Sequence, residues 1–346
     1  MPGGKHFWLS GVYKREMHHV FRCCHRHVER KFCSVRCVPR TLSSEHAEFL
    51  DLVRDHGEGS ITLTRDTSNS TIAILTLCNE TKKNAISGRM MVELADILDT
   101  LLLPEKITST TAAATTSDDI VGLIIRGQGR VFCAGADLTL VRDKVNTSER
   151  GLMMSRFMTD ALTRLRQSRL ITVALLTGPA VGGGAELSTV ADYRIMVQEE
   201  RGEREQTVEK DNKEEGTETG DRNHICFIHA SLGASPGWGG AYRLQSIVGR
   251  SAALRLLGTS VKVKPEQALA MGLVDQVVGI TQQSTTASVT TAAAASAHVH
   301  SSSSSSSPSS CTAAAGMSAA ISFLLPFTQQ PYPSAVGDIK QVDNPT

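Results

Sequence analysis

The chain has 346 residues, a formal net charge of +1 at pH 7 and a hydrophobic share of 40%, which suits one large domain with appendages. This balanced charge lacks the basic excess that drives binding to nucleic-acid phosphates. No apolar stretch approaches the roughly 18 residues that a membrane-spanning helix needs. We therefore expect neither a nucleic-acid partner nor a membrane span.

Residues 1–45 are a basic leader, in which the only acids up to residue 43 are Glu16 and Glu29. Such an Arg-rich, acid-poor segment is expected to be disordered or to act as a mitochondrial transit peptide. Cysteines and histidines cluster between residues 23 and 37, and both types bind zinc, but their spacing fits no closed zinc site. We therefore expect no metal centre.

Three of the eight cysteines lie in apolar runs further along the chain, at Cys78, Cys133 and Cys226. A free cysteine in such a run behaves as a small hydrophobic residue. This usage is typical of a reducing compartment.

Short apolar runs rich in Ile, Val and Leu recur between residues 60 and 281, and each is bounded by turn residues. They predict buried strands at 70–79, 120–127, 171–178, 192–197 and 224–229. Helical patterns at 88–102 and 151–168 alternate with these runs. Alternating strands and helices predict an α/β domain over 60–281.

Polar segments interrupt or follow this domain. A polar stretch at 104–119 and a charged stretch at 198–223 are expected to be insertions that loop into solvent, and the second could bind a partner through its acidic residues. Residues 282–346 begin with a Ser/Thr/Ala tract that offers few large apolar side chains to bury. We therefore expect a disordered, low-complexity tail.

Three glycines precede a glutamate in the segment AVGGGAEL (180–187), just after the predicted strand at 171–178. A helix that starts near Glu186 would present unobstructed backbone N–H groups, which attract negative charge. The alternative is that the glycines only allow close packing of the helix and the strand.

A second small-residue turn, CAGADL (133–138), follows the predicted strand at 120–127. Two strand ends, each followed by a loop with free amides, can supply two donors to one oxygen. Such an arrangement is an oxyanion hole.

With VFCAGADL and GPAVGGGAEL in this order, the chain resembles the crotonase (enoyl-CoA hydratase/isomerase) superfamily, and the similarity runs from residues 78–91 through 230–278. The resemblance implies a crotonase-like spiral of ββα units with disordered N- and C-terminal extensions. It implies that the N–H groups of Ala136 and Gly183 hold a coenzyme A thioester carbonyl as it becomes an enolate. Coenzyme A is part of the substrate, so no further cofactor is expected. Substrate contacts are expected at Lys82, Lys83, Ala85, Ala134, Asp137, Gly182 and Trp238.

The catalytic residues that the resemblance implies differ from those of the family's hydratases, which place two glutamates around a water molecule. Glu186 matches the first glutamate, but His229 stands at the second position. Together with Trp238 in SPGWGG, this pattern most resembles the decarboxylating members of the superfamily. These members remove CO2 from ethylmalonyl-CoA and, less readily, from methylmalonyl-CoA.

In that chemistry Glu186 would donate a proton to the enolate, and His229 would orient the departing carboxylate or deliver the proton itself. His229 as a core histidine and Trp238 as packing are the alternatives. Hydratase or isomerase chemistry, and a non-catalytic protein that binds acyl-CoA, also stay open.

Two departures from the family pattern bear on these expectations. Glu80 replaces a proline in the turn before the first helix, and the tail offers only ISFLLPF (321–327) where family members have helices that cover the acyl site. Resemblance further implies a homotrimer or hexamer. It favours the cytosol, whereas the basic leader favours the mitochondrion.

Overall fold

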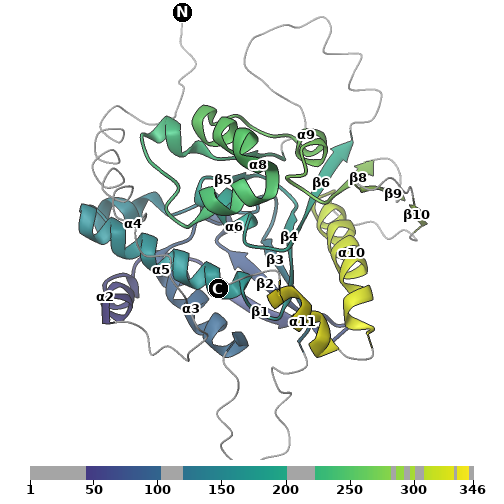
Figure 1. Cartoon of the computed structure of the whole chain (residues 1–346), viewed down its shortest axis with the longest axis horizontal. Coiled ribbons are helices and arrows are strands. Elements are labelled where there is room, and N and C mark those ends of the chain that lie inside the picture. The colour runs from purple at the N-terminus through teal and green to yellow at the C-terminus, as the bar shows by residue number, and fades with distance from the viewer. Residues whose placement is uncertain are drawn as a thin grey trace, which may run out of the picture.

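The computed structural model describes residues 44–102, 120–200, 223–281, 286–291, 297–300, 308–330 and 333–342. The basic leader up to residue 43, the insertion at 104–119 and most of the second insertion lie outside these residues. Within the described part, the fold is α/β with a central sheet, as the sequence predicts (Figure 1).

The central sheet has eight strands in the order β1-β2-β3-β4-β6-β8-β9-β10. The strands from β2 to β8 are parallel, and β1, β9 and β10 pair antiparallel at the two edges. A second, parallel pair is formed by β5 and β7. The bounds are β1 (Ser60–Arg65), β2 (Ile72–Cys78), β3 (Gly122–Gly127), β4 (Ile171–Leu176), β5 (Ala180–Val181), β6 (Tyr193–Glu200), β7 (Ile225–Cys226), β8 (Gln276–Thr281), β9 (Thr286–Thr291) and β10 (Ala297–His300).

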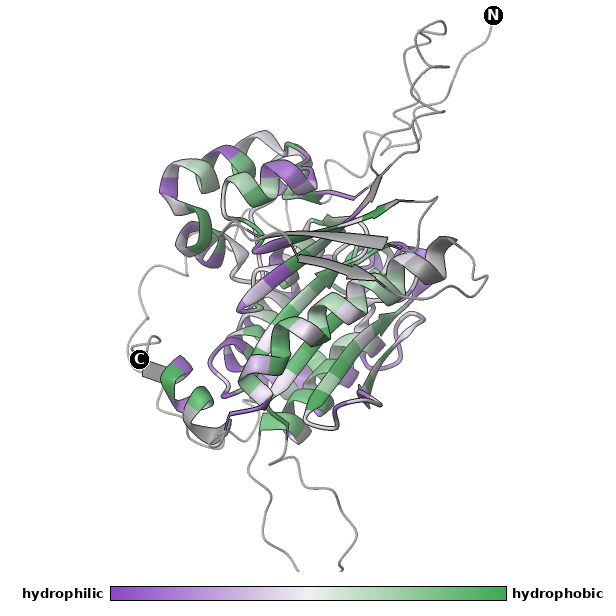
Figure 2. Ribbon diagram, turned by 90° about the vertical axis from the view of Figure 1, so that its right-hand side faces the viewer, coloured by the Kyte–Doolittle hydropathy of each residue, from purple (hydrophilic) through white to green (hydrophobic). Residues whose placement is uncertain are grey.

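Helices cover both faces of this sheet, which is why β4 is buried at every position and reads as a continuous apolar run. The helices are α2 (Ser44–Val53), α3 (Gly88–Leu102), α4 (Leu138–Asp143), α5 (Ser148–Arg166), α6 (Gly183–Ser188), α8 (Gly240–Thr259), α9 (Pro265–Ala270), α10 (Pro308–Thr328) and α11 (Pro333–Val342), with 3-10 turns η3 (Glu80–Lys82) and η5 (Ile228–Leu232). The larger core lies on the side of α2, α3 and α5, and a smaller one lies beneath α10 (Figure 2).

The domain starts earlier than the sequence patterns predict. Helix α2 precedes residue 60, and its side chains Phe49, Leu50 and Val53 are buried in the larger core. His46 of the same helix packs edge-on against Phe157 of α5. The expected start at residue 60 is therefore wrong, because α2 supplies part of the core.

The expected disorder of the tail is wrong for residues 286–291 and 297–300, which form β9 and β10, and for residues 308–330 and 333–342, which are mainly helical. Alanine has the highest helix propensity, so the small-residue tract forms a helix together with the apolar run that follows it. Ala320 and Leu324 of α10 are fully buried against the sheet. Gly316 allows close approach, because a Cβ there would lie 2.8 Å from Val197 Cγ2. ISFLLPF is thus the end of a 21-residue helix rather than an isolated run.

The second insertion is shorter than predicted, since β6 continues to Glu200 and the fold resumes at Asn223. The buried Asn223 amide donates hydrogen bonds of 2.8 Å to the carbonyls of Leu176 and Val197. It thereby joins the end of β4 to the middle of β6 at the point where the chain returns.

The strand predicted at 224–229 is reduced to β7, because the chain turns at Phe227 into η5. This turn carries His229 away from the sheet. Among the described residues, no helix has the length and apolar character needed to cross a membrane.

Candidate active site

The two glycine-rich loops lie side by side because they follow neighbouring strands. Strands β3 and β4 are parallel, so their carboxyl ends meet at one edge of the sheet. An isolated bridge pairs Cys133 with Ala180, and the N–H of Val181 donates to the Cys133 carbonyl at 2.9 Å. The predicted proximity of the two loops is therefore present in the structure.

The two predicted oxyanion donors fall on adjoining backbone. Ile86 donates to the Gly135 carbonyl at 2.8 Å and accepts from the Asp137 N–H at 2.9 Å, so the N–H of Ala136 between them points away from Ile86. Gly183 is the first residue of α6, where an N–H has no acceptor within the helix. A Cβ on Gly135 would lie 2.9 Å from the Gly183 nitrogen, so the two segments are in contact.

Each of the three successive glycines has its own structural reason. Gly182 has a φ of 57°, which favours glycine. A Cβ on Gly183 would lie 2.6 Å from Cζ3 of Trp238, and a Cβ on Gly184 would lie 2.0 Å from the Cys133 carbonyl oxygen. Close packing therefore accounts for Gly183 and Gly184, which also lie at the start of α6, where the backbone N–H groups have no acceptor within the helix.

Glu186 lies in the first turn of α6, which begins at Gly183 and not near Glu186 as predicted. Its side chain is almost completely buried, with a residue exposure of 1%. The carboxylate accepts hydrogen bonds from the N–H groups of Gly237 (3.2 Å), Trp238 (2.9 Å) and Gly240 (2.8 Å). Gly240 must lack a side chain, because a Cβ there would lie 2.4 Å from Glu186 Cγ.

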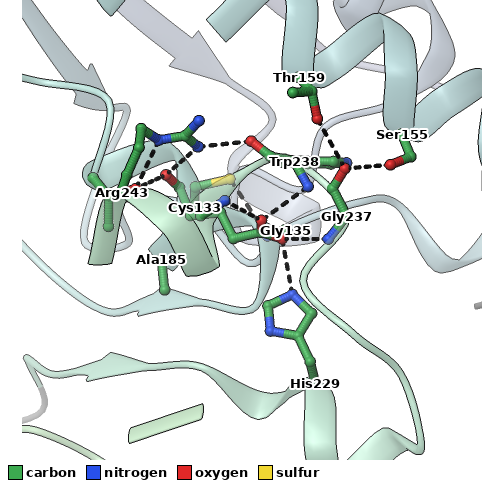
Figure 3. A network of polar contacts seen from close by, with 12 residues as sticks. Cys133, Gly135, Ser155, Thr159, Ala185, His229, Gly237, Trp238 and Arg243 are labelled. Atoms are coloured by element: carbon green, nitrogen blue, oxygen red, sulfur yellow. Dashed lines mark hydrogen bonds and ion pairs between the residues drawn. The ribbon is translucent and has the colours of Figure 1, made fainter. Parts of the chain in front are cut away.

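His229 contacts the same carboxylate from η5, as Figure 3 shows. Its Nε2 lies 3.0 Å from Oε1 of Glu186, and its side chain is 12% exposed. Its Nδ1 is buried and has no hydrogen-bond partner among the described residues. His229 is therefore not a core histidine with both nitrogens satisfied.

Arg243, which the sequence patterns do not predict as a site residue, is buried beside Glu186 on α8. Its guanidinium donates to the carbonyls of Trp238 (2.7 Å) and Glu186 (3.2 Å) and to the hydroxyl of Thr189 (3.0 Å). Burial lowers the pKa of Arg243 to about 10, although the nearby Glu186 carboxylate opposes this shift. Its sequence position gives no distinguishing signal, because the same helix also carries Arg250 and Arg255.

Helix α5 holds the loop that supplies the N–H donors. The hydroxyls of Ser155 (2.6 Å) and Thr159 (3.2 Å) both donate to the Gly237 carbonyl. The loop is thus fixed between α5 and Arg243 (Figure 3), and its N–H groups donate to Glu186. These two hydroxyls were also missed, because they lie far from the loop in sequence.

Asp137 and Lys82 form an ion pair of 2.8 Å beside the first loop. Asp137 also caps α4 by accepting from the Thr139 N–H at 2.8 Å. Burial opposes ionisation of Asp137, but the hydrogen bonds from Lys82 and Thr139 outweigh it, so its pKa is lowered. Both predicted contact residues therefore also have structural partners.

Three more predicted contact residues lie outside the Glu186 network: Lys83 and Ala85 follow η3, and Ala134 lies on the first glycine-rich loop. Lys83 is exposed and has a φ of 56°, and its carbonyl accepts from the Ala134 N–H at 3.0 Å. Ala85 is buried and Ala134 is half-buried. The structure thus brings these residues together around the first loop: Lys82, Lys83, Ala85, Ala134 and Asp137. None of them takes part in the hydrogen bonds of the Glu186 and His229 side chains.

Cys133 lies on the first loop, and its thiol is unreactive. Complete burial raises the pKa of its thiol to about 12, despite a hydrogen bond from the Gly135 N–H. The thiolate is the nucleophilic form of cysteine, so Cys133 is not a nucleophile at neutral pH.

The enoyl-CoA hydratase/isomerase family matches residues 67–204, which include both glycine-rich loops and Glu186. This match covers the stretch that carries the two loops whose motifs resemble the crotonase superfamily.

Curated relatives narrow the comparison. Ethylmalonyl-CoA decarboxylase of Xenopus laevis is 38% identical over 224 residues, which cover 65% of this chain and 62% of that protein. The protein of the same name from Gallus gallus is 38% identical over 226 residues, which cover 65% and 63%. The chain thus spans about three-fifths of the length of the curated relatives it matches.

Solved structures share the fold. DspI of Pseudomonas aeruginosa has a TM-score of 0.56 at 22% identity and covers 82% of this chain and 80% of its own. An enoyl-CoA hydratase from Polaromonas sp. JS666 has a TM-score of 0.56 at 18% identity, with 83% of each chain covered. At such low identity the similarity concerns the fold alone.

Proposed function

We propose that this chain removes CO2 from ethylmalonyl-CoA, and less readily from methylmalonyl-CoA, and releases butyryl-CoA from the former. The observation that carries the proposal is the pairing of one buried carboxylate, Glu186, with His229 at 3.0 Å. A hydratase of this family would need a second carboxylate where His229 lies. The names of the curated relatives, ethylmalonyl-CoA decarboxylase, support the same reaction.

The first step needs an electron sink and no base. The bond between Cα and the carboxylate carbon breaks, CO2 leaves, and its bonding electron pair passes through Cα onto the thioester oxygen as an enolate. The N–H groups of Ala136 and Gly183 would hold that oxygen from their adjoining backbone segments. One such donor contributes roughly 3 to 4 kcal/mol of transition-state stabilisation.

The second step is protonation of the enolate at Cα, which gives the saturated thioester. The reaction consumes one proton for each CO2 released. The Glu186–His229 pair is the proton source in this proposal, because it is the one titratable pair among the described residues that adjoins the Gly183 loop. A pair that holds a single mobile proton is suited to a reaction that needs one transfer.

Binding of the thioester would use the loop residues on either side of the donors. Lys82 and Lys83 would meet the phosphates of coenzyme A, and Lys82 is 35% exposed beside Asp137. The buried indole of Trp238 lies against Gly183 and would keep water from the enolate. Coenzyme A is part of the substrate in this proposal, and no further cofactor takes part.

Mass spectrometry of the purified chain, incubated separately with ethylmalonyl-CoA, methylmalonyl-CoA and crotonyl-CoA, tests the proposal. We expect butyryl-CoA from ethylmalonyl-CoA, and a loss of about a hundredfold or more in rate for Glu186→Ala and His229→Ala. Ile339→Ala, an exposed position on α11, serves as a control that keeps the rate. Hydration of crotonyl-CoA without any decarboxylation would instead assign a hydratase, and no turnover by a folded protein would assign a non-catalytic acyl-CoA binder.

A further inference from the structure

The two oxygens of Glu186 are already engaged by donors. Oε2 accepts from the N–H groups of Trp238 (2.9 Å) and Gly240 (2.8 Å), and Oε1 accepts from Gly237 (3.2 Å). A backbone N–H can only donate, so none of these three neighbours can receive a proton from Glu186. The remaining neighbour of the carboxylate is Nε2 of His229 at 3.0 Å.

The second ring nitrogen of His229, Nδ1, differs from these engaged carboxylate oxygens. Nδ1 is buried and, among the described residues, has no hydrogen-bond partner. Nε2 points to the Glu186 carboxylate, and in the view of Figure 3 the other ring nitrogen lies on the side of Ala185. A buried polar atom without a partner is uncommon in folded proteins and calls for a functional explanation.

We infer that Nδ1 of His229 is the atom that protonates the enolate carbon, and that Glu186 acts as a fixed anion that orients the imidazole and stabilises its charged form. The inference rests on the proposed function. In the step, the Nδ1–H bond breaks and a C–H bond forms at Cα. His229 becomes the neutral imidazole, whose remaining proton stays on Nε2 and is donated in a hydrogen bond to the Glu186 carboxylate. This role of the carboxylate parallels that of the buried aspartate that orients a catalytic histidine in hydrolases.

The same atom gives the protein a second activity. By microscopic reversibility, neutral Nδ1 removes one α-hydrogen from bound butyryl-CoA, and the resulting enolate is held by the same donors. The Nδ1 proton then exchanges with solvent and returns to the same face of the carbon. The protein will therefore exchange one α-hydrogen of a saturated acyl-CoA with solvent, without CO2.

Two reactions in D2O test this assignment. Ethylmalonyl-CoA is followed for CO2 release and for the face on which deuterium enters butyryl-CoA, and butyryl-CoA alone is followed for loss of α-hydrogen by NMR. We expect His229→Gln to lower the exchange about a hundredfold or more, and any butyryl-CoA it forms to carry deuterium on both faces. Glu186→Gln should exchange more slowly than the parent protein but keep deuterium on one face.

His56→Gln is the matched control. His56 also has a buried Nδ1 without a partner among the described residues, and its Nε2 lies 3.6 Å from a carboxylate oxygen of Asp143. It is remote from Glu186 in the hydrogen-bond network, so its variant should exchange at the parent rate. Thermal unfolding of each variant shows whether it is folded.

The outcomes separate the inference from the proposed function. Two results together would overturn the inference: butyryl-CoA from His229→Gln that carries deuterium on one face, and butyryl-CoA from Glu186→Gln that carries it on both faces. They would make Glu186 the acid, while the decarboxylase stands. Exchange by the parent protein without CO2 release would remove the proposed function and keep Nδ1 as the acid–base atom. If the folded parent protein catalyses neither reaction, both the inference and the proposed function are overturned.

Discussion

At the scale of single residues, the absence of a side chain at Gly183 determines where the Trp238 indole lies. The closest indole carbon would be 2.6 Å from a Cβ at this position, so a methyl group there must displace the ring. The N–H of Trp238 donates to Glu186, and therefore the displacement reaches the carboxylate as well. One position therefore affects both the packing of the indole and the placement of the Glu186 carboxylate.

We predict that Gly183→Ala lowers the free energy of unfolding by about 1 to 3 kcal/mol, as expected for overpacking, and lowers the rate of decarboxylation in the folded protein. Urea unfolding and steady-state kinetics measure the two effects. Gly258→Ala is the control, because a Cβ at Gly258 has nothing within 4 Å. A parent-like rate in Gly183→Ala would show that the indole does not position Glu186.

Asp137 gives a prediction on pH dependence. Its pKa is lowered by folding, so its carboxylate stabilises the fold above the ordinary value of 3.8, and this stabilisation is lost as the pH falls through the lowered pKa. We predict that Asp137→Ala lowers the free energy of unfolding by about 1 to 2 kcal/mol at pH 7, through loss of the α4 cap.

The difference between Asp137→Ala and the parent protein should shrink as the pH falls below about 4, because the parent then loses its charged cap and the ion pair with Lys82. Urea unfolding at pH 7 and at several values between 3 and 5 measures it. Asp137→Asn keeps a capping oxygen without charge and should fall between the two. A difference that is independent of pH would mean that the charge contributes nothing.

At the scale of elements, α10 covers the face of the sheet opposite to α2, α3 and α5 (Figure 1). Leu324 is fully buried there, so we predict that Leu324→Ala costs about 2 to 5 kcal/mol of unfolding free energy. Because the site loops contact the other core, the rate per folded molecule should stay unchanged.

Leu254→Ala on α8, where the side chain is 64% exposed, should change the free energy of unfolding by no more than about 0.5 kcal/mol. Urea denaturation of both variants, with activity measured without urea, separates stability from function. An unaltered transition in Leu324→Ala would contradict the packing of α10 on the sheet.

At the scale of the whole molecule, the sequence predicts what depends on local pattern. The strands β3 and β4 were predicted because both of their faces are buried and their apolar runs are continuous. The tail is not predicted as a helix because its first half packs through small residues such as Gly316 and Ala320, so the large apolar side chains are confined to the short run at its end. Arg243 was missed because its partners lie more than 50 positions away or are backbone carbonyls, which no spacing reveals.

Asn223 fixes the return of the chain from the segment 201–222 to the sheet, through its two amide hydrogen bonds to β4 and β6. With both ends held by the sheet, the free-energy cost of a longer connection rises by only about 0.6 kcal/mol for each doubling of its length. For protein engineering, this connection is therefore a suitable insertion site for a peptide or a reporter domain. Cargo placed between Glu200 and Asn223 would leave the hydrogen bonds that close the sheet intact.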